Sequence, residues 1–230
     1  SIIPNAFQIM MSMEIYSSIE TGFRMIRKVL TMPELVRPNQ EVTLSDQCYR
    51  FENVSFSYEK GIEVLHDINF EVKPNSVFAI VGESGSGKST IAKLMAGFFD
   101  ADDGRIYFGD QDVKSIPTSQ LMKHVAYVAQ DNFLFDTSIR ENLKIAKADA
   151  TDEEIQAALK AANCLELIER LPEGLNSNAG DCGKFLSGGE RQRITLARAM
   201  LADAQCIILD EATAYADVEN EAKIQEALSR

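Results

Sequence analysis

The sequence predicts an α/β fold, with antiparallel strands early in the chain and strands that alternate with helices later. Three observations lead to this prediction. Apolar residues recur at every second position over much of 51–72, which indicates half-buried strands. Two short apolar runs, 125–129 and 207–209, are typical of buried strands of a parallel sheet. Helical patterns at approximately 152–162 and 189–201 separate those two runs.

The composition narrows the class of protein. The 230 residues suffice for one large domain or for one domain with an appendage, and we favour the second. A net charge of -12 without any basic block argues against electrostatic binding of nucleic acid or anionic lipid. The four cysteines are far apart and form no C-x-x-C pair, so we expect neither disulfides nor a zinc site, and a reducing, intracellular environment. No apolar run approaches the roughly 18 residues of a membrane span. The start at Ser1, without a secretory leader, suggests an excised fragment or a processed product.

The region 1–47 is predicted to hold an amphipathic helix and a linker. Apolar residues recur every three or four positions from Met13 to Leu30, which is typical of a helix with one apolar stripe. Pro33 and Pro38 end this pattern, and the polar stretch 37–47 resembles a linker. The stripe packs either on the chain's own domain or on a neighbour that is missing here. A second domain is predicted over 48–230.

Antiparallel strands are predicted at the start of this second domain. Alternating apolar residues over 51–58 and 64–72 flank a turn at 59–61. The segment 105–108 is a further short strand between two glycine-containing turns.

A glycine-rich loop follows the apolar run 77–81, which is predicted to be a strand, and leads into a helical run that continues from Ile91. Glycines let the backbone take positive φ angles and turn its N–H groups toward a phosphate, and a helix N-terminus favours an anion. Lys88 can reach the β- and γ-phosphates, and the Ser89 hydroxyl can bind Mg²⁺. The loop residues are Gly82, Glu83, Ser84, Gly85, Ser86, Gly87, Lys88, Ser89 and Thr90. The alternative, a chance glycine-rich turn, would not match every fixed position and both flanks.

Two acidic residues end the last buried strand. Asp210 and Glu211 directly follow the run 206–209, and ligands of open α/β sheets bind at the carboxyl ends of strands. One carboxylate can hold Mg²⁺ through water, while its neighbour can orient or deprotonate the water that attacks the γ-phosphate. Adjacent acids at a strand end also occur by chance, but Lys88 upstream favours the functional interpretation.

A second phosphate-binding element is predicted where Ser187, Gly188 and Gly189 directly precede a helical run. One phosphate does not need two helix N-termini from distant segments of one chain. We therefore expect a second copy of the protein to supply this element to the phosphate held by Lys88, with two such shared sites under two-fold symmetry. A plain N-cap and loop is the alternative.

Together these motifs resemble the nucleotide-binding domains of ABC transporters. The resemblance covers approximately 48–230 and rests on the Lys88 loop, the Leu-Ser-Gly-Gly-Glu segment 186–190 and the Ile-Ile-Leu-Asp-Glu segment 207–211. It implies the P-loop NTPase fold of the ABC ATPases, with an antiparallel β subdomain, a RecA-like core and a helical signature subdomain. ATP and Mg²⁺ are the implied cofactors, and ATP hydrolysis is the implied activity.

The resemblance also implies roles for single residues. Tyr58 matches the aromatic residue that stacks on adenine, with a tyrosine of the strand core as the alternative. Gln130, directly after the strand 125–129, matches the glutamine that touches Mg²⁺ and the attacking water and senses the transmembrane partner. Glu211 matches the catalytic base, and Asp210 matches the acid on the magnesium side. The residues that bind ATP from the second copy, or cross the dimer interface, are Ser187, Gly188, Gly189 and Asp217.

The sequence departs from the family pattern in three places. Glu190 stands where glutamine is usual, which we expect to be tolerated. Residues 214–217 replace the usual Ser-Ala-Leu-Asp, so that only Asp217 is carried over. The family's switch histidine would follow the last residue, and His66 and His124 both precede the acids. We therefore expect this fragment to bind nucleotide and to hydrolyse it poorly.

The subtype is indicated by three further segments. Segments 130–135, 139–143 and 179–183 resemble exporter-type ABC proteins, in which a six-helix transmembrane domain precedes this domain in the same polypeptide. Helix 13–30 would then be the cytoplasmic end of the last membrane helix, and the domain would lie at the cytoplasmic face of the inner membrane. Residues 217–221 resemble transporters of iron-siderophores within this architecture.

Three classes of function are weighed. The first is the ATP-hydrolysing motor domain of a membrane transporter, which closes as a dimer on ATP. The second is a soluble ABC-type ATPase of DNA repair or of ribosomes. About 100 residues between Lys88 and Ser187 leave no room for the long coiled coil of the chromosome-repair type, and the acidic charge disfavours nucleic acid. The third is a regulatory module without turnover; Glu211 argues against it in the intact protein, though not in this truncated chain.

Overall fold

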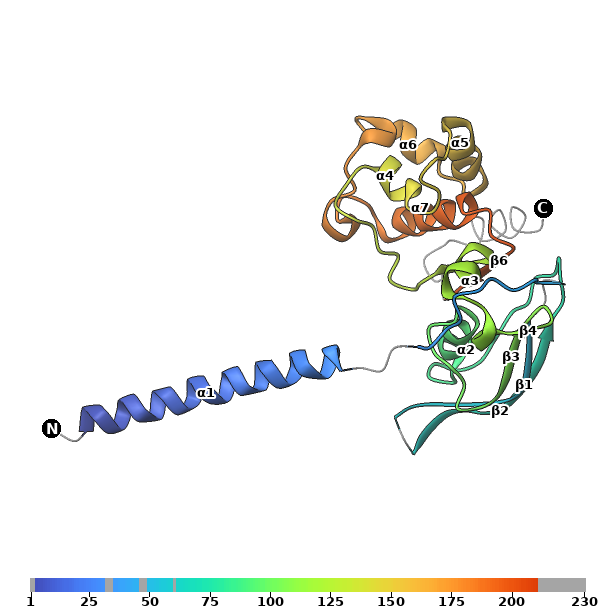
Figure 1. The fold of residues 1–230 in the computed structure, drawn as a ribbon. Helices are drawn as coiled ribbons and strands as arrows, with labels where there is room; N and C mark the ends of the chain where they lie inside the picture. Colours follow the sequence, from blue (N-terminus) through green and yellow to red (C-terminus); the bar gives the residue numbers. More distant parts are fainter. Residues whose placement is uncertain (1–2, 32–34, 46–48, 60, 211–230) are drawn as a thin grey trace. The chain divides into compact units, whose positions relative to one another are not determined.

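The computed structural model describes residues 3–31, 35–45, 49–59 and 61–210, and the chain divides into two compact units, Ser1–Val36 and Arg37–Arg230 (Figure 1). The first unit holds one helix, α1 (Ile3–Leu30). Its described apolar side chains, such as Tyr16 and Phe23, are exposed within this unit. Among the described residues, no helix combines the length and the hydropathy that a membrane span requires.

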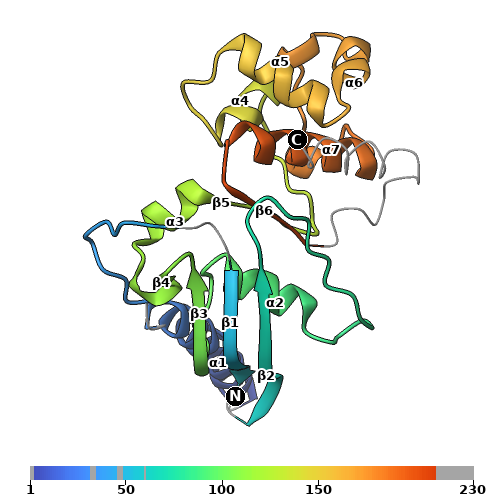
Figure 2. The ribbon, with the colours of Figure 1, turned by 90° about the vertical axis from the view of Figure 1, so that its right-hand side faces the viewer.

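The second unit begins with an antiparallel sheet. Its strand order is β2 (Ile62–Val72), β1 (Tyr49–Glu59), β3 (Asp103–Phe108) and β4 (Gln111–Asp112), with neighbouring strands antiparallel. The predicted early strands are thereby confirmed. Alternate residues of β1, including Tyr49 and Phe51, are buried and pack with residues of helix α2 (Lys88–Met95), which Figure 2 shows beside this sheet. The sheet and α2 thus form one core.

A two-stranded parallel sheet, β5 (Val125–Val128) and β6 (Cys206–Leu209), follows the predicted buried runs. The predicted strand 77–81 is wrong: this run forms no ladder among the described residues, and Val77 and Val81 are 73% and 88% exposed. A strand is defined by hydrogen bonds to a neighbouring strand, and within the described part of the chain β5 and β6 pair only with each other. The run contacts the core only in part, through Ile80 and by stacking of Phe78 on Phe70.

The longer helices that follow β5 build a second core. Helix α7 (Gly188–Leu201) contacts α4 (Ile139–Lys144) and α5 (Asp152–Ala161), and their fully buried residues include Leu143, Ile155 and Ile194. The predicted helices 152–162 and 189–201 are confirmed within a residue. The other helical segments are α3 (Thr118–His124), α6 (Leu165–Arg170) and the single-turn 3-10 helices η1 (Val113–Ser115), η2 (Gly174–Asn176) and η3 (Asp181–Gly183).

Candidate nucleotide site

The glycine-rich loop ends where α2 begins, at Lys88. Gly87, the residue before it, has a φ of 90°, and a Cβ there would stand 2.6 Å from Cδ2 of Leu65, so only glycine fits. The Lys88 ammonium donates hydrogen bonds to the carbonyl oxygens of Gly82 (3.0 Å) and Glu83 (2.7 Å). The ammonium group is therefore held beside the loop by two backbone carbonyl oxygens, and a phosphate oxygen can replace them as its hydrogen-bond acceptor.

The residue after Lys88 joins the loop to the end of β6. Ser89 Oγ donates a hydrogen bond of 2.7 Å to Oδ1 of Asp210, and the Tyr127 hydroxyl donates one of 2.7 Å to Oδ2. Asp210 is 7% exposed, and its backbone N–H bonds to the Val128 carbonyl, which continues the β5–β6 ladder. Burial, followed by the hydrogen bond to Asp210, raises the pKa of Tyr127. Tyr127 therefore stays a neutral donor to the carboxylate.

The Ser89 hydroxyl and the Asp210 carboxylate suit a magnesium ion by their chemistry. Both are oxygen ligands, and Mg²⁺ prefers oxygen and keeps several of its waters in proteins. Because each oxygen of Asp210 already accepts a hydrogen bond, coordination of the ion by this carboxylate through water is the arrangement that fits best. No group of three or more His, Cys, Asp or Glu side chains that could hold an ion occurs among the described residues.

Tyr58 lies on β1 beside the same loop. Its hydroxyl is 3.2 Å from Oγ1 of Thr90, two residues after Lys88, and its ring packs edge to face on Phe56 and Phe99. The residue is 47% exposed, so a face of the ring is accessible to a stacking partner. The structure thus brings together five of the predicted site residues from three distant segments: Tyr58, Lys88, Ser89, Thr90 and Asp210.

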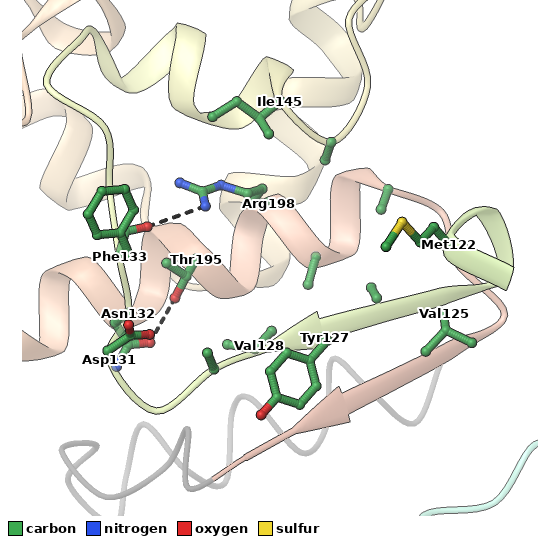
Figure 3. Close-up of a pocket in the computed structure, with 15 residues that line it drawn as sticks. Met122, Val125, Tyr127, Val128, Asp131, Asn132, Phe133, Ile145, Thr195 and Arg198 are labelled. Atoms are coloured by element: carbon green, nitrogen blue, oxygen red, sulfur yellow. Dashed lines mark hydrogen bonds between the residues drawn. The ribbon is translucent and has the colours of Figure 1, made fainter. Parts of the chain in front are cut away.

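Gln130 follows β5 in a loop that side chains of α7 hold in place. Asn132, whose φ is 47°, donates to the Gln130 carbonyl (3.2 Å) and accepts a hydrogen bond of 2.9 Å from Thr195 (Figure 3). Arg198 donates to the Phe133 carbonyl at 3.3 Å. No sequence pattern indicated the roles of Asn132, Thr195 and Arg198, although an asparagine after a predicted strand is a known signal for the left-handed backbone.

A pocket of about 340 Å³ lies between β5, this loop and α7 (Figure 3). Its rim carries exposed apolar side chains of Met122, Phe133 and Ile145, and the buried Thr195 lines its wall. No pattern in the sequence pointed to this pocket, because its lining comes from segments far apart in the chain.

Ser187 caps the N-terminus of α7. Its Oγ accepts a hydrogen bond from the Glu190 backbone N–H (3.3 Å), and the Glu190 carboxylate accepts one from the Ser187 N–H (2.8 Å), which completes a capping box. Arg170 adds an ion pair to Glu190 at 3.1 Å. The N-cap that the sequence allowed is thus formed. Within the described residues, the hydrogen bonds of the Ser187 side chain all go to Glu190, and none joins it to the Lys88 loop.

The capping box gives the stability of α7 a pH dependence. The Ser187 backbone N–H, then the Ser187 hydroxyl and Arg170, lower the pKa of Glu190 below its ordinary 4.5. A lowered pKa means that this carboxylate stabilises the fold above pH 4.5, and that the contribution is lost as the pH falls through the folded-state pKa. In urea unfolding, the stability advantage of wild type over Glu190→Gln should therefore shrink as the pH is lowered through this window. A difference that stays constant would contradict this assignment.

Two predicted site residues, Glu211 and Asp217, lie outside the described residues, as do Cys48 and the end of the predicted domain 48–230. The segment 37–45, which the sequence assigned to the linker, makes its contacts inside the second unit.

The glycine-rich loop at the start of α2, the Ser89–Asp210 hydrogen bond and the partly exposed Tyr58 are the arrangement expected of a nucleotide-binding domain. The family model "ABC transporter" matches residues 65–214, which is more than half of the chain. This protein belongs to the ABC transporter family, and the predicted fold class and family are confirmed. ATP hydrolysis is the expected activity of such a domain.

The relatives include an ATP-binding/permease protein and an ATP-dependent flippase. The heavy metal tolerance protein of Schizosaccharomyces pombe is 48% identical over 78% of this chain and 22% of its own length. The mycobactin import ATP-binding/permease protein IrtA of Mycolicibacterium thermoresistibile is 42% identical over 93% of this chain and 25% of its own. The ATP-dependent lipid A-core flippase of Desulfotalea psychrophila is 40% identical over 94% and 38%.

A solved structure supports the same assignment. A bacterial Atm1-family ABC exporter with ATP bound superposes with a TM-score of 0.83 at 34% identity, and the match covers 93% of this chain and 38% of that one. The predicted exporter type is therefore confirmed at the level of the domain. The chain spans between about a fifth and two fifths of the length of the proteins named here.

Proposed function

We propose that this chain is the ATP-hydrolysing domain that powers transport by a membrane ABC transporter, through ATP-driven association of two such domains. The observation that carries the proposal is the 2.7 Å hydrogen bond from Ser89 to Asp210, which unites the phosphate loop with the acid at the end of β6. Two of the relatives named above are an ATP-binding/permease protein and a lipid flippase, and neither is a DNA-repair ATPase, which favours the transporter over the soluble alternative.

Each predicted site residue has a role in this proposal. The Lys88 ammonium binds the β- and γ-phosphate oxygens, and the Tyr58 ring stacks on the adenine. Ser89 and Asp210 hold Mg²⁺, which supplies positive charge to the transferred phosphoryl group. Glu211 accepts the proton of the attacking water, and Gln130 orients that water beside the ion. The backbone N–H groups of the loop, over 82–90, neutralise charge that the Lys88 cation does not reach.

A second domain of the same kind completes the site. Ser187, Gly188 and Gly189 stand at an N-terminus of a 14-residue helix, where backbone N–H groups and the helix dipole favour an anion. Ser187 is exposed and lacks any bond to its own chain's loop within the described residues, which supports presentation to another copy. Asp217 crosses the same interface. Two-fold symmetry then gives two composite sites.

The transmembrane domain is the other proposed partner, in the same polypeptide and at the cytoplasmic face of the membrane. One of the relatives named above, IrtA of Mycolicibacterium thermoresistibile, carries ATP-binding and permease functions under one name, which supports this arrangement. The exposed apolar rim at Met122, Phe133 and Ile145, next to the Gln130 loop, is the surface we assign to it. Movement of that loop would then link the membrane helices to the water that Gln130 orients. Whether the cargo is an iron-siderophore stays a prediction.

The base assignment is tested by Glu211→Gln in the intact transporter that contains this chain. Glutamine cannot accept the proton but keeps the shape of the side chain, so the variant should bind Mg-ATP, lose hydrolysis and accumulate as an ATP-bound dimer on size-exclusion chromatography. Glu153→Gln, an exposed acid in the first turn of α5, is the matched control. Wild-type hydrolysis by Glu211→Gln would assign the base elsewhere.

A further inference from the structure

The segment 37–45 is tied to the second unit although it forms no helix or strand. Arg37 Nη1 and Nη2 donate to the two carboxylate oxygens of Asp100 at 3.1 and 2.7 Å. The Val42 N–H and carbonyl both bond to the side-chain amide of Gln120, at 3.0 and 2.7 Å. Val42 and Leu44 pack against the core of the sheet and α2. Side chains, rather than backbone ladders, therefore hold this strap, as we name residues 37–45.

The Arg37 pair differs from the other ion pair of the strap. The Arg37 side chain is 6% exposed, the Asp100 side chain is 31% exposed, and Arg37 binds both carboxylate oxygens, so this is a partly buried, bidentate contact. Lys123 and Glu41 are 3.4 Å apart and both about two thirds exposed. A partly buried bidentate pair fixes the position of its partners better than an exposed single contact does.

Asp100 directly follows the two aromatic residues that support the nucleotide site. Phe99 packs edge to face on Tyr58, with ring centroids 5.3 Å apart. Phe98 packs on Tyr127, 5.1 Å away, which is the donor to Asp210. The three consecutive residues 98–100 thus contact the strap, the stacking tyrosine and the partner of the magnesium-side acid.

We propose that Arg37 is a positioning residue for ATP binding: through Asp100 it fixes Phe99, and Phe99 holds the Tyr58 ring where adenine stacks. This inference rests on the proposed function, because it takes Tyr58 as the adenine contact. Arg37 is also the first residue of the second unit, directly after the unit that contains α1. A displacement of the chain at Arg37 would therefore act on Tyr58 through the side chains of Arg37, Asp100 and Phe99.

The test is calorimetric binding of Mg-ATP to this chain. Arg37→Ala should weaken the affinity about tenfold, whereas Lys123→Ala, which breaks the exposed pair of the same strap, should leave it within about twofold of wild type. Arg37→Lys, which keeps the charge but not the bidentate geometry, should lose part of the affinity. The exchange of Arg37→Asp with Asp100→Arg should restore most of it.

A second measurement separates positioning from general weakening of the fold. In a Tyr58→Ala background, Arg37→Ala should reduce the affinity no further, because its route to the nucleotide is already lost. Wild-type affinity in both Arg37→Ala and Arg37→Lys, or a full additional loss on top of Tyr58→Ala, would overturn the inference. If Arg37→Ala fails to fold, Arg37→Lys and the charge exchange decide it. Failure of wild type itself to bind Mg-ATP would instead overturn the proposed function.

Discussion

Lys88→Ala is expected to abolish measurable Mg-ATP binding. The ammonium of this residue is the group at the mouth of the loop, where it is held by the carbonyl oxygens of Gly82 and Glu83. Its removal leaves the phosphates without their cationic partner. Truncating one member of a charge-assisted contact costs about 2–5 kcal/mol, which corresponds to a roughly 30- to 5000-fold loss of affinity. Isothermal titration calorimetry of the chain measures this directly.

Lys93→Ala is the matched control for Lys88→Ala. Lys93 lies in the last turn of the same helix, so its removal changes the net charge equally while the loop stays intact. We expect an affinity within about threefold of wild type, since a charge at that end acts only at long range. Equal affinity in wild type and Lys88→Ala would remove the phosphate-loop assignment.

Asp210→Asn is expected to abolish the enhancement of ATP binding by Mg²⁺. Asparagine has nearly the shape of aspartate, but its one carbonyl oxygen can replace only one of the two oxygens that accept from Ser89 and Tyr127, and it brings no negative charge to a cation. The affinity for ATP in Mg²⁺ should fall by about 10- to 100-fold, toward the value measured in EDTA. ATP titrations with and without Mg²⁺ give both numbers for each variant.

Asp203→Asn serves as the control for Asp210→Asn. Asp203 is exposed and has a φ of 51°, a backbone conformation that asparagine adopts readily. This variant should keep the full Mg²⁺ enhancement. An Asp210→Asn chain that still gains affinity from Mg²⁺ as wild type does would assign the ion to other ligands.

Local patterns predicted the parts of this fold that local physics decides. The alternation in β1 and β2 and the helical periods of α5 and α7 are set by which face of each element is buried. The strand expected at 77–81 failed for the opposite reason. Its apolar composition fits a strand, but a strand needs a neighbour to bond with, and that neighbour is a long-range property of the fold.

The candidate site likewise combines residues that a local sequence pattern predicts with residues that only the fold brings together. The phosphate-loop motif lies within the nine consecutive residues 82–90, so its spacing alone predicted Lys88 and Ser89 as site residues. The contact between Thr195 and Asn132 joins residues 63 positions apart, and Arg37 and Asp100 are also 63 apart. Neither pair has a spacing rule, and the polar strap 37–45 looked like a free linker because its anchors lie elsewhere in the sequence.

The central claim is that each ATP is bound between Lys88 of one copy and the Ser187 segment of another, and mixing two inactive variants tests it most directly. Lys88→Ala disables the loop. Gly188→Asp should disable the signature by repelling phosphate, and it should fold, because Gly188 has no positive φ and an acid suits the first turn of α7. A mixed dimer then retains one composite site with both halves intact.

The readout is energy transfer between fluorescent labels on the two chains, with and without Mg-ATP. The account predicts an ATP-dependent signal for wild type and for the mixture of Lys88→Ala with Gly188→Asp, and none for either variant paired with itself. A wild-type pair that associates on ATP while the mixture does not would show that both halves of each site come from one chain, which contradicts the account.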